Sequence, residues 1–168
     1  MAADDVAGKS LKWLLEMRFP DARERALACL RAIAATAPED CPMPDMANAL
    51  ASPNFRTLRE LAADIGAFLE FQDRREAEGC LFEYADCSLG NLVFSGRWLR
   101  PGRDFNAACG ELGALCSRRA EVVNVTRGEN LVLTALKAAG TYLARESNIV
   151  SAQHTPAPIA ELFLLPAY

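Results

Sequence analysis

The hydrophobic pattern of this chain changes its period near residue 120, and that change most limits what the chain can fold into. Before it, apolar residues recur every three or four positions, as on one face of a helix. After it, they alternate with a period of two or form short apolar runs, as in β-strands. The pattern therefore predicts an α/β protein whose helices come first and whose sheet comes last.

The first 85 residues are predicted to be mainly helical. A long apolar stripe from about Asn54 to Arg75 indicates one amphipathic helix packed on the core. Shorter helices are predicted at Ser10–Phe19 and Asp21–Thr36, with a helical turn at Asp45–Leu50. Prolines in the segments between them exclude one continuous helix.

The part after residue 120 is predicted to form a small sheet with a hairpin near the C-terminus. Gly140 can take a positive φ, so the turn that contains it joins two of the strands. The last run is mostly apolar, which predicts a strand buried on both faces. With the helices packed on it, this sheet of four or five strands completes a single domain over residues 1–168. The predicted strands are Glu121–Thr126, Leu131–Leu136, Thr141–Ala144 and Ile159–Leu165.

Between these two parts, a polar segment at residues 86–88 leads into an apolar helical pattern that begins at Leu89. Asp86 and Ser88 are residue types that cap a helix start. Gly90 has no Cβ and allows a close approach, and the Asn91 amide both donates and accepts hydrogen bonds. The segment predicts a capped helix, which is either structural only or also a binding site for phosphate or another anion.

Two helices are expected after this start. The first runs from Leu89 to Leu99, and its small residues Ser95 and Gly96 suggest that it lies close against a sheet. Trp98 is expected on its buried side. The second follows Asp104 as its cap and continues to about Ser117.

Five segments, in order, resemble motifs of the 2-phospho-L-lactate transferase and gluconeogenesis-factor family (CofD/YvcK-like). The first is Ser88-Leu89-Gly90-Asn91-Leu92, which resembles the S-[IL]-G-N-L segment of that family. The resemblance covers residues 86–166. The other four segments are Asp104-Phe105 with Ala107, Val122–Thr126, Gly140 with Glu146–Ile149, and Leu162–Pro166.

The resemblance implies a Rossmann-like three-layer parent fold, of which this chain holds the second half after a divergent helical region at residues 1–85. The family transferases move a phospholactyl-type group from a nucleotide-activated donor to a deazaflavin alcohol with a divalent metal, so magnesium is implied. The gluconeogenesis-factor branch is regarded as binding nucleotide sugars or dinucleotides in a regulatory role. The chain departs from the family because it has no strand followed by a Gly-Gly-Thr-Gly-like loop.

The candidate ligand-binding residues are Asp86, Ser88, Gly90, Asn91 and Thr126. Ligands in open α/β sheets bind beyond the carboxyl ends of strands, which would place Thr126 beside the helix start. The alternative is that Thr126 is only a strand-terminating hydroxyl. No catalytic residue is assigned.

Other polar residues give weaker signals. Glu146 and Asn148 match the family pattern, and we interpret them as capping or ending the hairpin. His154 is the single histidine and lies near two prolines without a nucleophile-elbow pattern, which disfavours nucleophilic catalysis. No metal-binding motif is visible, since the six cysteines have no CxxC pair and no zinc-ligand spacing.

Charge and cysteine usage limit the partners and the compartment. The net charge is −4 and the basic residues are dispersed, so no nucleic-acid surface is predicted. The acidic N-terminus is no secretory signal, and the thiols indicate a reducing, cytoplasmic protein. No apolar run reaches the roughly 18 residues that a membrane span needs.

Three functions remain open from the sequence. The first is a transferase of the 2-phospho-L-lactate type. The second is a non-catalytic protein that binds a nucleotide or another phosphate-containing small molecule. The third is a partial module that assembles with another chain, a second copy included, because a sheet without its first strands would expose an edge.

Overall fold

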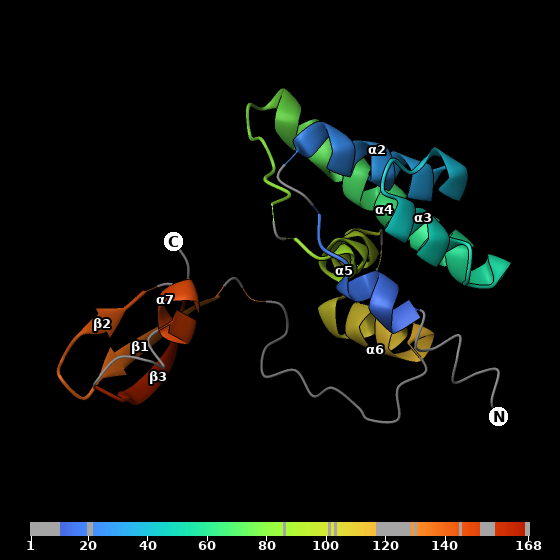
Figure 1. The fold of residues 1–168 in the computed structure, drawn as a ribbon. Helices are drawn as coiled ribbons and strands as arrows, with labels where there is room; N and C mark the ends of the chain where they lie inside the picture. The colour runs from blue at the N-terminus through green and yellow to red at the C-terminus, as the bar shows by residue number, and fades with distance from the viewer. Residues whose placement is uncertain are drawn as a thin grey trace. The chain divides into compact units, whose positions relative to one another are not determined.

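The structure is a computed structural model that describes residues 11–19, 22–85, 87–100, 102, 104–116, 129, 131–144, 146–151 and 157–166. The chain divides into two compact units, one up to residue 124 and one from residue 125. In the described ranges the first unit is helical, and the second holds a three-stranded antiparallel sheet and one short helix (Figure 1). The protein is therefore mixed α/β, and its described helices all come before the sheet, as the change of period predicts, except the short helix that lies between two strands.

Helix α4 (Phe55–Ala77) is the centre of the helical unit, and its predicted apolar stripe is confirmed. The Asn54 side chain caps it by accepting from the Thr57 N–H at 2.9 Å. Two arginines lie in its last turn, where they suit the negative end of the helix dipole, and Gly79 follows with a φ of +84°. Helices α2 and α5 both pack against α4 (Figure 1).

The segments around α2 match the predicted helices with small shifts at their ends. Helix α2 (Arg23–Ala34) follows Ala22 as its N-cap, which makes no side-chain capping bond. The predicted cap, Asp21, lies outside the described residues. The 3₁₀ helix η1 (Pro38–Asp40) and helix α3 (Pro44–Leu50) each begin with proline, which is tolerated in a first turn because its missing N–H would have no helical partner there.

The first predicted helix, Ser10–Phe19, is too long at its C-terminal end. The structure is helical at residues 11–16, and Arg18 then forms an antiparallel bridge with Ser88. The Phe19 N–H donates to the Cys87 carbonyl at 3.0 Å. The chain leaves the helix here because a distant segment supplies these bonds.

Helices α5 (Leu89–Leu99) and α6 (Phe105–Leu115) begin at the predicted residues. Asp104 caps α6 by accepting from the Ala107 N–H at 2.5 Å. Two expectations about α5 are wrong. Its small residue Gly96 lies against the backbone of α4 and not against a sheet. Trp98 is exposed, because α5 packs on α4 with its other side.

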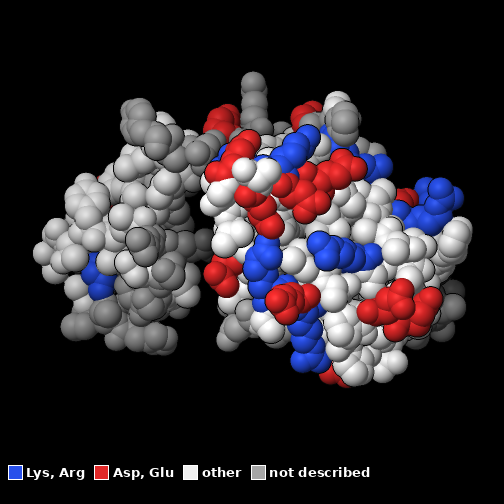
Figure 2. All heavy atoms as spheres, turned by 90° about the horizontal axis from the view of Figure 1, so that it is seen from above, with Lys and Arg blue, Asp and Glu red and all other residues white. Residues whose placement is uncertain are grey.

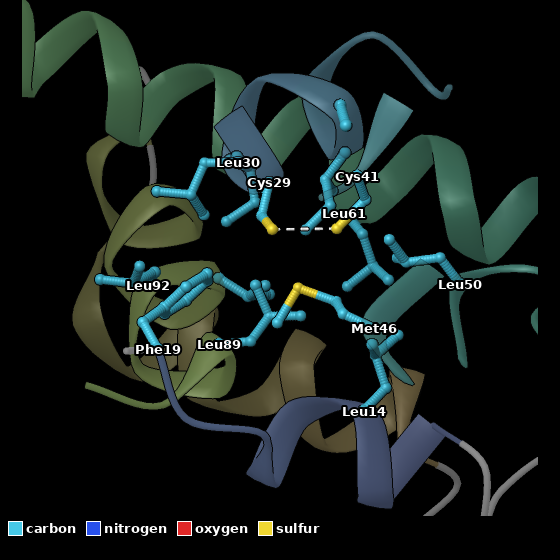
Figure 3. Close-up of a cluster of buried hydrophobic side chains, with 14 of the residues drawn as sticks. Leu14, Phe19, Cys29, Leu30, Cys41, Met46, Leu50, Leu61, Leu89 and Leu92 are labelled. Carbon is cyan, nitrogen blue, oxygen red and sulfur yellow. Dashed lines mark hydrogen bonds between the residues drawn. The ribbon is translucent and has the colours of Figure 1, made fainter. Parts of the chain in front are cut away.

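The core of the helical unit gathers side chains from residues 11–16 and from α2, α3, α4 and α5 (Figure 3). Residues 11–16 contribute Leu14, and α2, α3 and α4 contribute Leu30, Met46 and Leu61. Full burial of one such side chain stabilises the fold by about 1.5–3 kcal/mol. Because α5 adds Leu89 and Leu92 to this same cluster, the predicted boundary after residue 85 falls inside the helical unit.

The described sheet has the order β2-β1-β3, and both pairings are antiparallel. Strands β1 (Leu131–Lys137) and β2 (Tyr142–Leu143) form the predicted hairpin, and Gly140 in its turn has a φ of +81°. Strand β3 (Ile159–Pro166) pairs along the other side of β1, from Leu131 opposite Pro166 to Lys137 opposite Ile159. These strands contain none of the parallel pairing that a Rossmann-like sheet would have.

Two features of the sheet unit differ from prediction. Strand β3 is not buried on both faces, since Leu162, Leu164 and Leu165 are exposed. Helix α7 (Glu146–Ser151) occupies the segment interpreted as the end of the hairpin, and its Ile149 is buried. The predicted strand Glu121–Thr126 lies outside the described residues.

Among the helices that the structure describes, none combines the length and the apolar character needed to cross a lipid bilayer.

Candidate functional site

The start of α5 carries three of the predicted ligand-binding residues, Ser88, Gly90 and Asn91, in one turn. The Ser88 side chain accepts from the Asn91 N–H at 3.2 Å, so the predicted N-cap is confirmed. The Leu89 N–H donates to the Met17 carbonyl at 2.9 Å. Some of the backbone donors at this helix start are therefore already bonded within the chain.

Gly90 provides room for the chain's own backbone. A Cβ built on Gly90 would lie 2.9 Å from the carbonyl oxygen of Leu15. That distance is too short for a side chain, so the helix at residues 11–16 and α5 approach closely only because this position is glycine. The approach predicted for a ligand at Gly90 is thus made, on this side of the residue, by Leu15.

Asn91 is exposed at the same helix start. Its backbone takes part in the cap, and its carbonyl accepts from the Ser95 hydroxyl at 2.8 Å. The side-chain amide can therefore act on a bound molecule without breaking the cap. The two remaining candidates, Asp86 and Thr126, lie outside the described residues, and their roles stay predictions.

A buried ion network joins α4 to α5, and the sequence analysis missed it. Asp64 is fully buried and accepts from Arg97 Nε and from Arg100 Nη1, each at 2.8 Å. Arg97, 1% exposed, also lies 3.2 Å from Glu60 and 3.9 Å from Glu111. This buried carboxylate is paired with an arginine on each oxygen. The two pairs offset much of the free energy that removing the carboxylate from water costs.

A second network joins α2, α4 and the segment before α5. The Tyr84 hydroxyl donates to Gln72, whose amide donates to Glu76, and Glu76 pairs with Arg23. Burial raises the pKa of the Tyr84 hydroxyl. The bond from Gln72, and then the Arg23 guanidinium, hold the pKa of Glu76 below its ordinary value. These groups are all engaged with one another, which indicates a structural network.

Sequence spacing held a signal for both networks. Asp64 lies three residues after Leu61 and four before Phe68, in phase with the apolar stripe of α4. Gln72 lies four residues after Phe68, and it too is buried. A polar residue in phase with an apolar stripe predicts a buried, partnered side chain.

Two cysteine thiols face each other in the core (Figure 3). Cys41 Sγ donates to Cys29 Sγ at 2.9 Å, and both residues are buried. Burial, followed by the bond with Cys41, raises the pKa of the Cys29 thiol to about 12. Since the thiolate is the nucleophile, Cys29 is poorly suited to nucleophilic catalysis near neutral pH.

The face of the helical unit seen in Figure 2 has no basic field, and the described ranges have no metal-ligand cluster. On the face of the helical unit in Figure 2, Lys and Arg side chains are interleaved with Asp and Glu, unlike the single basic field of a nucleic-acid surface. Within the described ranges, no three His, Cys, Asp or Glu residues are grouped so that they could hold a metal ion.

Comparison of the chain with protein-family models, with curated proteins and with solved structures gives no match.

Proposed function

We propose that this chain is a CofD/YvcK-like protein that binds a nucleotide or another phosphate-containing small molecule at the start of α5. The single observation that carries the proposal is the turn at Ser88–Asn91, where the motif serine caps the helix and the motif asparagine keeps an exposed side chain. Anions are favoured at a helix N-terminus by its partial positive charge.

The positions of the other motif residues support the resemblance. Asp104 caps α6, Gly140 turns the hairpin with a positive φ, and Glu146 begins α7. Motif residues that stand at the ends of elements have a physical reason to occur at fixed spacing. Their order along the chain therefore supports the resemblance at the motif residues that the structure describes.

Three finer features follow from the resemblance: a Rossmann-like parent fold, magnesium as the metal, and phospholactyl transfer as the family chemistry. A cytoplasmic location is inferred separately, from the cysteine usage. Binding requires fewer residues than turnover does, and the sequence contains no glycine-rich strand–loop segment. We therefore place binding first and transfer second.

We expect Asn91→Ala to weaken nucleotide binding by roughly ten- to a hundredfold, because a hydrogen bond to a charged ligand contributes about 1.5–3 kcal/mol. The melting temperature should change little, since the side chain of Asn91 is exposed and the cap uses its backbone. Calorimetry with a panel of nucleotide sugars and dinucleotides, with and without magnesium, measures the affinity.

Ser88→Ala shows the effect of losing the cap on stability, which should fall by about 1 kcal/mol. If Asn91→Ala lowers the melting temperature and leaves affinity unchanged, the ligand role is wrong. Incubation with a nucleotide-activated donor, a deazaflavin alcohol and magnesium tests transfer, and no product above a no-protein control removes the transferase function. No heat with any ligand removes the binding function too.

Strand β3 favours a second candidate, assembly with another chain. It is at the edge of the described sheet, and its leucines at 162, 164 and 165 are 59%, 47% and 48% exposed. An exposed apolar edge strand is a template for pairing with another strand. A second copy could pair with it about a two-fold axis.

For this candidate, we expect the wild type to sediment as a dimer, and Leu164→Lys to shift it to the monomer. Lysine at the edge brings a charge into the paired strands, which strand pairing tolerates poorly. Val150→Lys in α7 is the control, because it replaces another exposed apolar side chain of the same unit away from the edge. A wild-type protein that is folded and monomeric at about 100 μM would exclude this assembly, since stable dimers have far lower dissociation constants.

A further inference from the structure

An apolar pocket of about 290 Å³ lies in the helical unit, at the C-terminal ends of α4 and α5. The segment that follows α4 closes its third side. Four of its large apolar side chains are at least one-third exposed, which is unusual for so many neighbouring residues. The pocket is lined by Phe71, Leu81, Phe82 and Trp98, and by the polar Arg75 and Ser95, among others.

The aromatic walls are held in place by packing. The rings of Phe68 and Phe82 meet edge to face with centroids 5.4 Å apart, and Phe82 meets Tyr84 in the same way at 5.0 Å. Tyr84 is fully buried. Edge-to-face pairs of this kind fix ring orientation, so the pocket has rigid aromatic walls in this part.

Arg75 is the one charged residue among those that line the pocket. The other polar groups there are already bonded: the Gln72 amide to Tyr84 and Glu76, and the Ser95 hydroxyl to the Asn91 carbonyl. Arg75 Nη1 pairs with Glu78 at 2.5 Å, and its Nη2 donates to Cys80 Sγ at 3.3 Å; the Arg75 and Glu78 side chains are about half exposed. An exposed pair of this kind is weak, so a ligand anion could replace Glu78.

We propose that this pocket binds a small planar aromatic molecule that carries one anionic group. The volume suits a molecule of about two rings and is too small for a helix or strand of a partner protein. The rings lie against the aromatic walls, where π-faces and edges give the best contacts. The anion lies beside Arg75, the one charge that the lining offers.

This site is separate from the one proposed at the start of α5. Ser95 and Trp98 lie seven and ten residues after Ser88, which is roughly 10–15 Å along a helix at 1.5 Å per residue. Binding at one site therefore needs none of the side chains of the other. The two proposals can fail independently.

The test uses 2-naphthoate as the anionic probe and 2-naphthamide as a neutral probe of the same shape. The chain has two tryptophans, so its ¹⁵N-labelled form gives two indole signals, which Trp13→Phe assigns. We expect naphthoate to shift the Trp98 signal saturably, with a dissociation constant at or below about 1 mM for a ligand of this size. Trp13 does not line the pocket, so its signal should not shift.

The charge requirement is tested with two neighbouring arginines. Arg75→Gln should weaken naphthoate binding about tenfold and leave naphthamide binding unchanged, since a charge-assisted hydrogen bond is lost. Arg74→Gln removes an equal charge from the same turn of α4 but not from the pocket, and it should change neither probe.

Four results would overturn the proposal. The first is no shift of the Trp98 signal up to the solubility of the probe. The second is an equal response of both tryptophans, which indicates nonspecific binding. The third is equal affinity of the wild type for naphthoate and naphthamide, which removes the anionic requirement without any variant. The fourth is a Trp98 signal that shifts with protein concentration alone, because a second copy would then cover the pocket.

Discussion

Gly96→Ala should strongly destabilise the helical unit. A Cβ on Gly96 would lie 1.8 Å from the carbonyl oxygen of Asp64, which belongs to the backbone of α4 and cannot rotate away. Helices α4 and α5 would have to separate, and overpacking of a close contact costs 1–3 kcal/mol or more. We expect a loss above about 3 kcal/mol and a melting temperature lower by roughly 10 °C or more.

Two other helical glycines provide matched controls. Gly66 in α4 and Gly110 in α6 have nothing within 4 Å of a built Cβ. At these positions alanine should stabilise the protein by up to about 1 kcal/mol, because it is the better helix former. Melting followed by circular dichroism compares the three variants. If Gly96→Ala melts with the controls, the close crossing of α4 and α5 is wrong.

Asp64→Ala is the second change from which we expect a large effect. It leaves the Arg97 guanidinium 1% exposed and without its closest partner. Removing one member of a buried ion pair costs about 3–5 kcal/mol, because the remaining charge stays out of water. Urea unfolding should show this as a lower midpoint with an unchanged slope.

The network also predicts an asymmetry and a rescue. Arg97→Met should cost less than Asp64→Ala, because Asp64 keeps its bond from Arg100 at 2.8 Å, whereas the nearest partner left to Arg97 is Glu60, which is farther away at 3.2 Å and 37% exposed. The double variant should lose less stability than the two single variants lose together, since no buried charge of this pair remains. Additive losses would contradict the direct pairing of Asp64 with Arg97.

An exposed ion pair is the control for these variants. Lys12 and Glu16 lie 3.7 Å apart, with side chains 74% and 64% exposed. Lys12→Ala should change stability by no more than about 0.5 kcal/mol, as is usual for exposed pairs.

Local signals predicted most of the described helices and the candidate helix start. Asn54, Ser88 and Asp104 cap helices where their residue types indicate a start, because a capping bond forms within four residues of chain. The hairpin at Gly140 follows from a positive φ that glycine adopts without strain. These features depend on neighbours in sequence, so the sequence alone contains their cause.

Features that depend on distant partners were not predicted. The helix at residues 11–16 ends early because the Met17 carbonyl accepts from Leu89, the first residue of α5, and the Phe19 N–H donates to Cys87 just before it. Gly90 and Gly96 suggested close approaches, but the pattern could not say that Leu15 and Asp64 would make them. The exposure of Leu162, Leu164 and Leu165 depends on what covers β3, which an apolar run does not encode.

The sequence by itself determined that most helices come before the strands, that α4, α5 and α6 begin at capping residues, and that the hairpin turns at Gly140. Capping bonds, turns and the periodicity of helices and strands each involve only a few neighbouring residues, so a short stretch of sequence is enough to predict them. Only the tertiary structure decided that Asp64 meets Arg97, that Cys29 faces Cys41, and that an aromatic pocket opens beside Arg75. Each of these joins residues of different helices or loops. Packing brings them together, and packing depends on shape and burial in three dimensions.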